Sequence, residues 1–201
     1  MSYGFKLISA SGITQIDDNY ANILAISSGT LSGNSTFTGS IIPYDVQTSS
    51  NGILFLRSVT NVEFAIGFAS GASNAVLWSN SNITASYIIG RYADTLTSAN
   101  YKTGYGLNVF KPDGKLVFST NAEVMLLVAA FTINLTSNTT YNLTLPTTTK
   151  DKYVAINQTY ITETPLGLLK HLTIKFISDT QLSVYSGGNL GEVAILIGVK
   201  A

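Results

Sequence analysis

The sequence contains no cysteine and a single histidine, His171, among its 201 residues. Without cysteine there can be no disulfide framework, no thiolate metal site and no cysteine nucleophile. Structural zinc needs three or four Cys, His or carboxylate ligands, and a Ser-His-Asp mechanism would depend on His171, yet no G-x-S-x-G turn occurs. We therefore predict a non-enzymatic protein with no catalytic residue, no metal site and no cofactor. Two-carboxylate chemistry stays open, because eleven Asp and Glu are present, although they are scattered.

Charge is also scarce. Only 11% of the residues are charged, and eleven Lys and Arg cancel eleven Asp and Glu. With 45% hydrophobic residues the chain is predicted to be globular, since disorder requires low hydrophobicity and high net charge. No cluster of Lys and Arg exists, so neither nucleic acid nor an anionic membrane is a predicted partner.

Long hydrophobic runs are missing as well. The longest, residues 124–133, is about half of the roughly 20 residues that a membrane helix requires, so we expect a buried strand and no membrane insertion. The first residues pass directly into a strand-like pattern, without the basic, apolar and small-residue order of a secretory signal. We therefore expect no cleaved leader.

An internal repeat runs through the chain. Residues 3–16 align with residues 105–118, and the two segments share a Tyr-Gly pair and a second glycine eight residues after it. The same order continues with Ile42-Pro43 over Leu145-Pro146, and with residues 87–90 over residues 195–198. We predict an internal duplication, with a first copy at 1–93, a linker at 94–104 and a second copy at 105–201. The alternative is that β-rich sequence has converged on similar short words.

The pattern within each copy favours strands. Short runs rich in Val, Ile, Thr, Tyr and Phe are bounded by Gly, Asn, Asp or Ser, which is typical of an antiparallel sandwich or barrel. Pro112-Asp113-Gly114 has the composition of a tight hairpin turn. We predict an all-β protein made of two tandem antiparallel, jelly-roll-like β-sandwich domains. Residues 20–28 stay undecided between helix and strand, because Asp17 or Asp18 could cap a helix while the equivalent residues 124–133 are β-branched and apolar.

The repeated segment carries a family resemblance. The opening Tyr-Gly-Phe-x-Leu-Ile of residues 3–8 and, more closely, the Tyr-Gly-Leu-Asn-Val-Phe of residues 105–110 resemble the start of small tail-module proteins of tailed bacteriophages. In that group "YGL-x-V-F" is followed by a glycine turn and "L-x-F-D". Here the motif occurs twice, and the second copy has Ser119 where the family tends to have Asp.

The resemblance implies a function. It points to a structural protein of the virion, made in the bacterial host cytoplasm, located at the tail tip, baseplate or fibre attachment region, and contributing to host adhesion. The implied partners are other virion proteins and further copies of the chain in a ring or trimer. The family has no catalytic residues to carry over.

Two other readings share these features. The first is a capsid decoration protein or head fibre. The second is a carbohydrate-binding module or polysaccharide-degrading enzyme built on a β-sandwich, because aromatic side chains on loops bind sugars by stacking. A host-surface glycan would then be a partner, and the tyrosines to test are Tyr44, Tyr92, Tyr101 and Tyr160.

Overall fold

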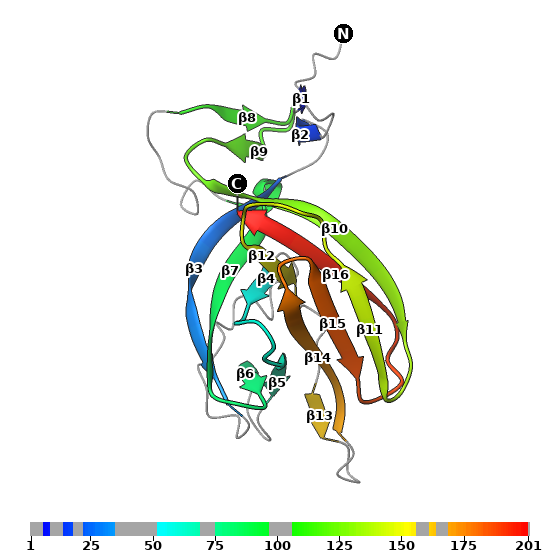
Figure 1. The fold of residues 1–201 in the computed structure, drawn as a ribbon. Helices are drawn as coiled ribbons and strands as arrows, with labels where there is room; N and C mark the ends of the chain where they lie inside the picture. The colour runs from blue at the N-terminus through cyan, green and yellow to red at the C-terminus, as the bar shows by residue number, and fades with distance from the viewer. Residues whose placement is uncertain are drawn as a thin grey trace.

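The computed structural model describes residues 6–8, 14–17, 22–34, 52–68, 75–96, 106–155, 161–163 and 169–200. Apart from one short 3-10 helix, their regular structure is entirely β, which confirms the all-β prediction for this part of the chain (Figure 1). The elements are β1 (Lys6–Ile8), β2 (Thr14–Asp17), β3 (Ile23–Gly33), β4 (Gly52–Arg57), β5 (Phe64–Phe68), β6 (Ala75–Ser79), β7 (Ile83–Tyr92), η1 (Ala93–Thr95), β8 (Asn108–Phe110), β9 (Leu116–Ser119), β10 (Glu123–Leu135), β11 (Thr139–Thr144), β12 (Lys152–Ala155), β13 (Ile161–Glu163), β14 (Leu169–Ser178), β15 (Gln181–Ser186) and β16 (Gly191–Lys200).

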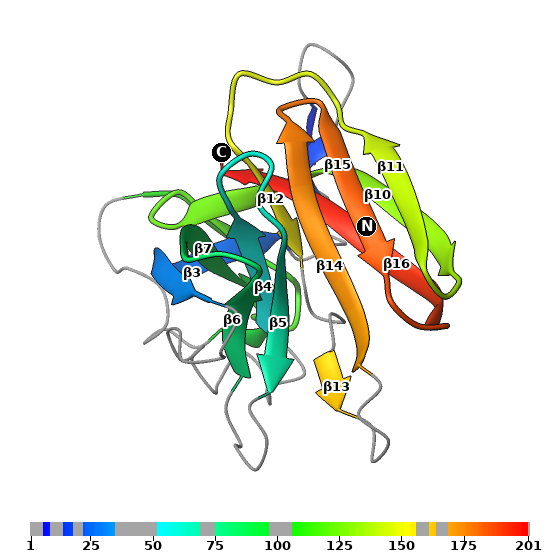
Figure 2. The ribbon, with the colours of Figure 1, turned by 60° about the horizontal axis from the view of Figure 1, so that its bottom comes forward.

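Six antiparallel strands close into a barrel in the order β10-β16-β12-β4-β7-β3. The ring closes through only three residue pairs between β3 and β10, after which these two strands diverge (Figure 1). A second antiparallel sheet, β11-β15-β14-β5-β6, lies against the opened part of the barrel, and β13 pairs with β14 (Figure 2). The hairpins β1-β2 and β8-β9 lie at the end where β3 and β10 meet.

The two halves of the sequence share this architecture. Each half supplies three neighbouring strands of the barrel: β3, β7 and β4 come from the first half, and β12, β16 and β10 come from the second. The two sets join where β4 pairs with β12. The second sheet is shared in the same way, through pairing of β5 with β14. The structure thus differs from the expected pair of separate sandwiches. The physical reason is that a three-stranded half leaves unpaired backbone groups along its edge strand, and the two edges satisfy each other.

The main hydrophobic core lies between the barrel and the second sheet, and both halves contribute to it. Its fully buried aromatic ring, Phe64, stacks on Phe176 with ring centroids 6.3 Å apart. Of the linker expected at 94–104, only residues 94–96 are described, and Asp94 and Thr95 belong to η1. The described part of the linker thus follows directly on the barrel strand β7.

The two motif hairpins have the same register. In β1-β2 the pair is Lys6 with Asp17, and in β8-β9 it is Asn108 with Ser119, each residue 102 positions further along the chain. In both ladders the register shifts at the same place, after the second residue of the first strand. The matched segments of the sequence thus adopt the same backbone pairing.

The long strands repeat this correspondence. The ladder of β3 with β7 has a bulge after Ala25, which lies opposite Gly90, and the ladder of β10 with β16 has a bulge after Leu127, which lies opposite Gly198. A bulge bends its strand and increases the local twist. Both halves therefore bend at the same point, where the barrel closes.

An approximate two-fold axis relates the halves and passes through the barrel. Matched residues pair with each other at both barrel walls: Ile23 with Met125, and Phe55 with Ala155. The four side chains belong to one buried cluster inside the barrel. The fully buried Phe55 ring packs against both of these matched glycines. An added Cβ would lie 3.1 Å from Cε2 of Phe55 at Gly90 and 2.9 Å from Cε1 of Phe55 at Gly198.

The undecided segment at 20–28 proves to be β-structure where it is described. Strand β3 pairs with β7 along its whole length, from Ile23 to Gly33, so sheet pairing outweighs any local helical preference. Residues 36–42, where the same alternation also predicts a strand, lie outside the described residues. Among the described segments, no helix is long and apolar enough to cross a membrane.

Candidate functional site

The hairpin of β8 and β9, which carries the second copy of the motif, has a well-defined turn. The backbone of Gly114 adopts a φ of +81°, which favours glycine, and its N–H donates to the carbonyl of Lys111 at 2.9 Å. The N–H of Lys115 donates to Oδ1 of Asp113 at 3.1 Å. The turn predicted at Pro112-Asp113-Gly114 is therefore confirmed.

An ion pair fixes the turn of this hairpin to the end of β7. Lys111 Nζ lies 2.8 Å from Oδ2 of Asp94, which belongs to η1. The hydrogen bond to Asp94 raises the pKa of Lys111, the charges of Asp94 and Asp113 add to this rise, and desolvation opposes it. The second motif hairpin is thus tied to the last strand of the first half.

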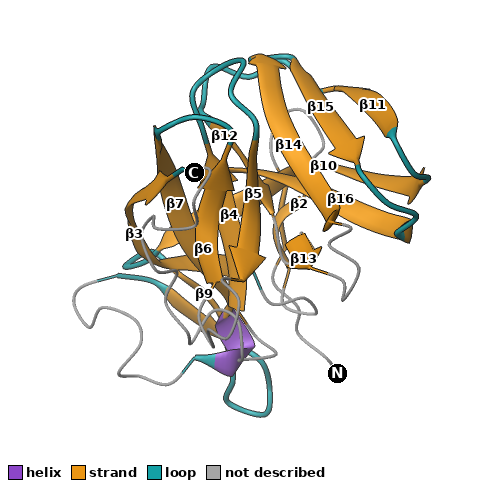
Figure 3. Cartoon of the chain, turned by 90° about the horizontal axis from the view of Figure 1, so that it is seen from below, coloured by secondary structure: helices purple, strands orange, loops and turns teal. Residues whose placement is uncertain are grey.

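Backbone and apolar contacts complete the attachment. Asn22 donates from its backbone N–H and from Nδ2 to the carbonyl of Val117, at 3.2 and 3.1 Å. Leu116 is buried in a small cluster with Leu24, Ala93 and Val124. Because these contacts come from β3, η1 and β10, they hold the hairpin against the end of the barrel where β3 and β10 pair. Figure 3 shows β9 near the short helix η1.

Large apolar side chains stay in solvent on this end of the molecule. Leu107 is 52% exposed and Phe110 is 47% exposed, and both belong to the motif. The backbone at Leu107 is fixed, since its N–H donates to Oγ1 of Thr120 at 2.8 Å. Tyr92, at the end of β7, is 42% exposed. Exposed apolar side chains on a hairpin whose backbone is held in place are typical of a contact surface.

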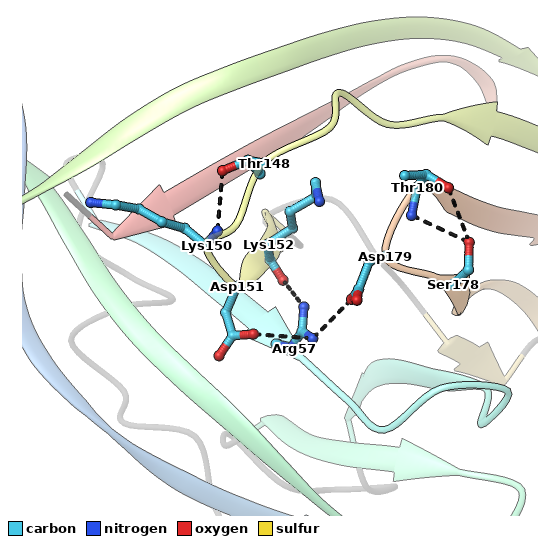
Figure 4. Close-up of polar contacts among 8 residues, drawn as sticks. All are labelled: Arg57, Thr148, Lys150, Asp151, Lys152, Ser178, Asp179 and Thr180. Atoms are coloured by element: carbon cyan, nitrogen blue, oxygen red, sulfur yellow. Dashed lines mark hydrogen bonds and ion pairs between the residues drawn. The ribbon is translucent and has the colours of Figure 1, made fainter.

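A second candidate is a polar network at the junction of the two halves (Figure 4). Nη2 of Arg57 lies 3.2 Å from Oδ1 of Asp151 and 3.2 Å from Oδ1 of Asp179, and Nη1 donates to the carbonyl of Lys152 at 3.3 Å. The guanidinium also lies 5.8 Å from the ring centroid of Phe176. The network connects β4, the start of β12 and the turn between β14 and β15.

This arrangement favours a structural role over hydrolysis. A two-carboxylate glycosidase places its carboxyl groups across a scissile bond. Here Asp151 and Asp179 both point to one guanidinium nitrogen, as Figure 4 shows. The network therefore holds two turns together, and it brings one arginine and two aspartates from distant parts of the sequence to the same place.

A third candidate is a hollow of about 340 Å³ where β3 and β10 part. Its wall includes Ser27 and Ser28 of β3 together with Glu123 and Lys200, whose Oε2 and Nζ lie 2.7 Å apart. The hollow is polar and its two charges are paired. It contains no nucleophile with an adjacent base among its lining residues.

The residues singled out from the sequence have different outcomes. Tyr92 is exposed, whereas Tyr44, Tyr101 and Tyr160 lie outside the described residues. His171 is placed only by its backbone, which pairs with Ile161. In the described part of the chain no three His, Asp or Glu side chains come together to hold a metal ion.

Sequence reasoning missed two features. The exposure of Leu107 and Phe110 was not predicted, because apolar residues in a short run of strand-forming residues are expected to face a core. The Arg57 network has no local signal, since its members are far apart in the chain. A search of protein-family models, of curated proteins and of solved structures finds no match to this chain.

Proposed function

We propose that the chain is a non-enzymatic structural protein of a bacteriophage virion, assembled in the host cytoplasm into the tail tip, baseplate or fibre attachment region. The observation that carries the proposal is the exposure of Leu107 and Phe110 on a rigidly attached hairpin. Both residues belong to the motif at 105–110 that resembles phage tail modules. The part of the sequence that carries the resemblance is thus also the part that offers apolar contact surface.

The attachment of the hairpin supports this role. A contact surface that is already ordered loses less conformational entropy on binding than a flexible one. The pair of Lys111 with Asp94 and the bonds from Asn22 to Val117 supply that order before any partner arrives. The proposed partners are other virion proteins, together with further copies of the chain in a ring or trimer.

We further infer that the two halves arose by duplication of one smaller β-unit. The support is the common register of the two hairpins and the common bulges opposite Gly90 and Gly198. In this view the copies did not remain separate sandwiches but completed one barrel and one sandwich-like core together. The duplication would give the particle two matched hairpins on one subunit.

The test uses purified particles of the phage that encodes the chain. Mass spectrometry should find the chain in the virion, and antibody labelling should place it on the tail. Its absence from particles would refute the proposal, while labelling on the head would replace it with the capsid decoration reading. Glycan binding that is lost on Tyr92→Ala would instead favour the carbohydrate-binding reading.

A pair of variants tests the contact surface itself. Leu107→Ser combined with Phe110→Ser should leave the unfolding midpoint almost unchanged and reduce incorporation into particles by about tenfold or more, because central apolar contacts carry most of an interface's energy. Val59→Ser is the matched control, since Val59 is also a large exposed apolar residue, in the connection after β4. Equal incorporation of both variants would show that the hairpin is not the contact.

A further inference from the structure

Strands β10 and β11 lie on the same side of the molecule, one at the open side of the barrel and one at the end of the second sheet (Figure 2). A short turn joins them, and the hydroxyl of Tyr141 on β11 donates to the carbonyl of Asn134 on β10 at 2.6 Å. We call residues 126–135 of β10 and 139–144 of β11 the β10-β11 edge.

Among the described strands, none pairs with the outer side of this edge. β10 pairs with β16 as far as Leu135 but with β3 only at Glu123, Val124 and Met125. β11 pairs with β15 alone among the described strands. At about 3.4 Å per residue, the two open strands are roughly 34 and 20 Å long. Two unpaired ladders of this length offer a template for added strands.

The edge also lacks the features that usually prevent such pairing. Natural edge strands carry charged residues or proline. Residues 124–149 contain no Asp, Glu, Lys or Arg, and Pro146 lies beyond the end of β11. The bulge after Leu127 leaves the rest of β10 in regular pairing. An edge that is long, uncharged and regular is expected to associate.

The apolar core is incompletely covered at the same edge. Ala129 and Phe131 on β10 and Tyr141 and Leu143 on β11 pack against the main core, yet all four are only partly buried. Leu127 is 47% exposed. A partner that continued both sheets would cover these side chains and pair the backbone in one step.

We propose that the β10-β11 edge binds the same edge of a second copy of this chain, so that β10 pairs antiparallel with β10 and β11 with β11 across a two-fold axis. Within the chain, the halves already join in this way, by pairing β4 with β12 in one sheet and β5 with β14 in the other. Because the edge carries no charged side chain, it offers no electrostatic attraction to a charged partner. The same edge of a second copy is equally uncharged and apolar, and therefore matches it. The interface does not depend on where the protein acts, so it goes beyond the tail assignment. It also narrows the ring or trimer of the proposed function to an assembly built from two-fold dimers.

Strand β3 of the first half differs from β10 at this place. The stretch of β3 that corresponds to Ala129–Thr132 is Ser27, Ser28, Gly29 and Thr30, which is polar and exposed. Among the described strands, the apolar edge therefore lies on the β10 side of the molecule. Self-association through it uses both copies of the edge and closes as a dimer rather than continuing as a fibre.

The experiment measures the mass of the full-length protein in solution by sedimentation equilibrium. The wild type should be a dimer at micromolar concentrations. Ala130→Lys places two like charges within one strand pair and should raise the dissociation constant by at least about 100-fold. Ser28→Lys is the matched control, because Ser28 is the exposed counterpart on β3, 102 positions earlier, and it should leave the dimer intact.

Several outcomes would overturn the proposal. They are a monomeric wild type up to about 100 µM, dimers of Ala130→Lys as strong as those of Ser28→Lys, or a trimer. If Ala130→Lys does not fold, Thr140→Lys on β11 makes the same test, since Thr140 is exposed and lies on the other strand of the edge. Dimer loss would leave the virion experiment unaffected, so failure of one proposal is distinguishable from failure of the other.

Discussion

The two halves of the chain solve one packing problem in opposite ways. In the first half Tyr87 of β7 lies opposite Gly29 of β3, and a Cβ on that glycine would sit 2.8 Å from Cε1 of the tyrosine. In the second half the matched pair is Ile195 of β16 opposite Phe131 of β10. The aromatic ring has moved from one strand to its neighbour. Volume is therefore conserved across the strand pair and not at each position, which is how a close-packed interior accepts change.

Side-chain volume is shared in the same way at the approximate two-fold axis inside the barrel. Phe55 is fully buried and Ala155, its partner across the axis, is small. A chain of two identical halves would have to place the same residue at both positions. Because the two halves belong to one chain, their sequences can differ. The Phe55 ring fills the centre of the barrel, and the small Ala155 leaves space for it.

Exchanging the two residues at the axis should have the largest effect. Phe55→Ala removes a fully buried ring and should lower the free energy of unfolding by about 3–5 kcal/mol. Ala155→Phe alone should cost about 1–3 kcal/mol through overpacking. The double variant should regain a large part of both losses in chemical denaturation. A double variant as unstable as the sum of the two losses would show that the two positions are not interchangeable.

The matched glycines should respond unequally. An added Cβ at Gly90 would lie 2.6 Å from Cγ2 of Ile23, a stiff β-branched side chain. At Gly198 the closest atoms are less near, at 2.9 Å for Cε1 of Phe55 and 3.0 Å for Cε of the flexible Met125. We expect Gly90→Ala to cost about 2–3 kcal/mol and Gly198→Ala about 1–2 kcal/mol in the same measurement. The reverse order would contradict the packing described for the barrel interior.

The matched positions Phe131 and Gly29 should show a smaller difference in the free energy of unfolding. Phe131→Ala removes a partly buried ring and should cost about 2 kcal/mol, less than a fully buried phenylalanine would. Gly29→Ala should change the free energy of unfolding by less than about 1 kcal/mol, since the outer end of the Tyr87 ring can move aside. Thermal unfolding of the two variants, each against the wild type, gives the comparison.

The pH dependence of the second hairpin should be the smallest effect. The pKa of Lys111 is raised by its hydrogen bond to Asp94, so the pair stabilises the folded state below the lysine's unfolded pKa of about 10.4 and this contribution is lost as the pH rises through the folded pKa. Lys111→Met should lack that alkaline loss. Unfolding midpoints from neutral pH to about pH 11 measure it, and identical alkaline slopes in both proteins would contradict the prediction.

The sequence is sufficient for the all-β class, for the strand expected at 124–133 and for the turn at Pro112-Asp113-Gly114, because these depend on local alternation and turn chemistry. It does not reveal which strands pair. β4 and β12 read as buried strands, yet nothing in their letters says that each is the other's neighbour in one barrel. Non-local pairing has no local signal.

The same limit applies to the contact surfaces. The motif letters Leu107 and Phe110 predict a strand, but their exposure follows from the hairpin having only two strands of its own. The Arg57 network depends on residues that meet only after the halves join. The sequence therefore predicts which residues form the hairpin, but it does not predict that Leu107 and Phe110 stay exposed to solvent.

The junction of β4 with β12 has a consequence for synthesis of the chain on the ribosome. β4 emerges with a bare edge, and its partner is translated about 100 residues later, which takes roughly 5–20 s at ordinary elongation rates. During that interval the N-terminal half carries exposed backbone and apolar surface. Neighbouring nascent chains on one message could exchange halves at this stage, so translation speed between the two strands would govern the yield of correctly closed barrels.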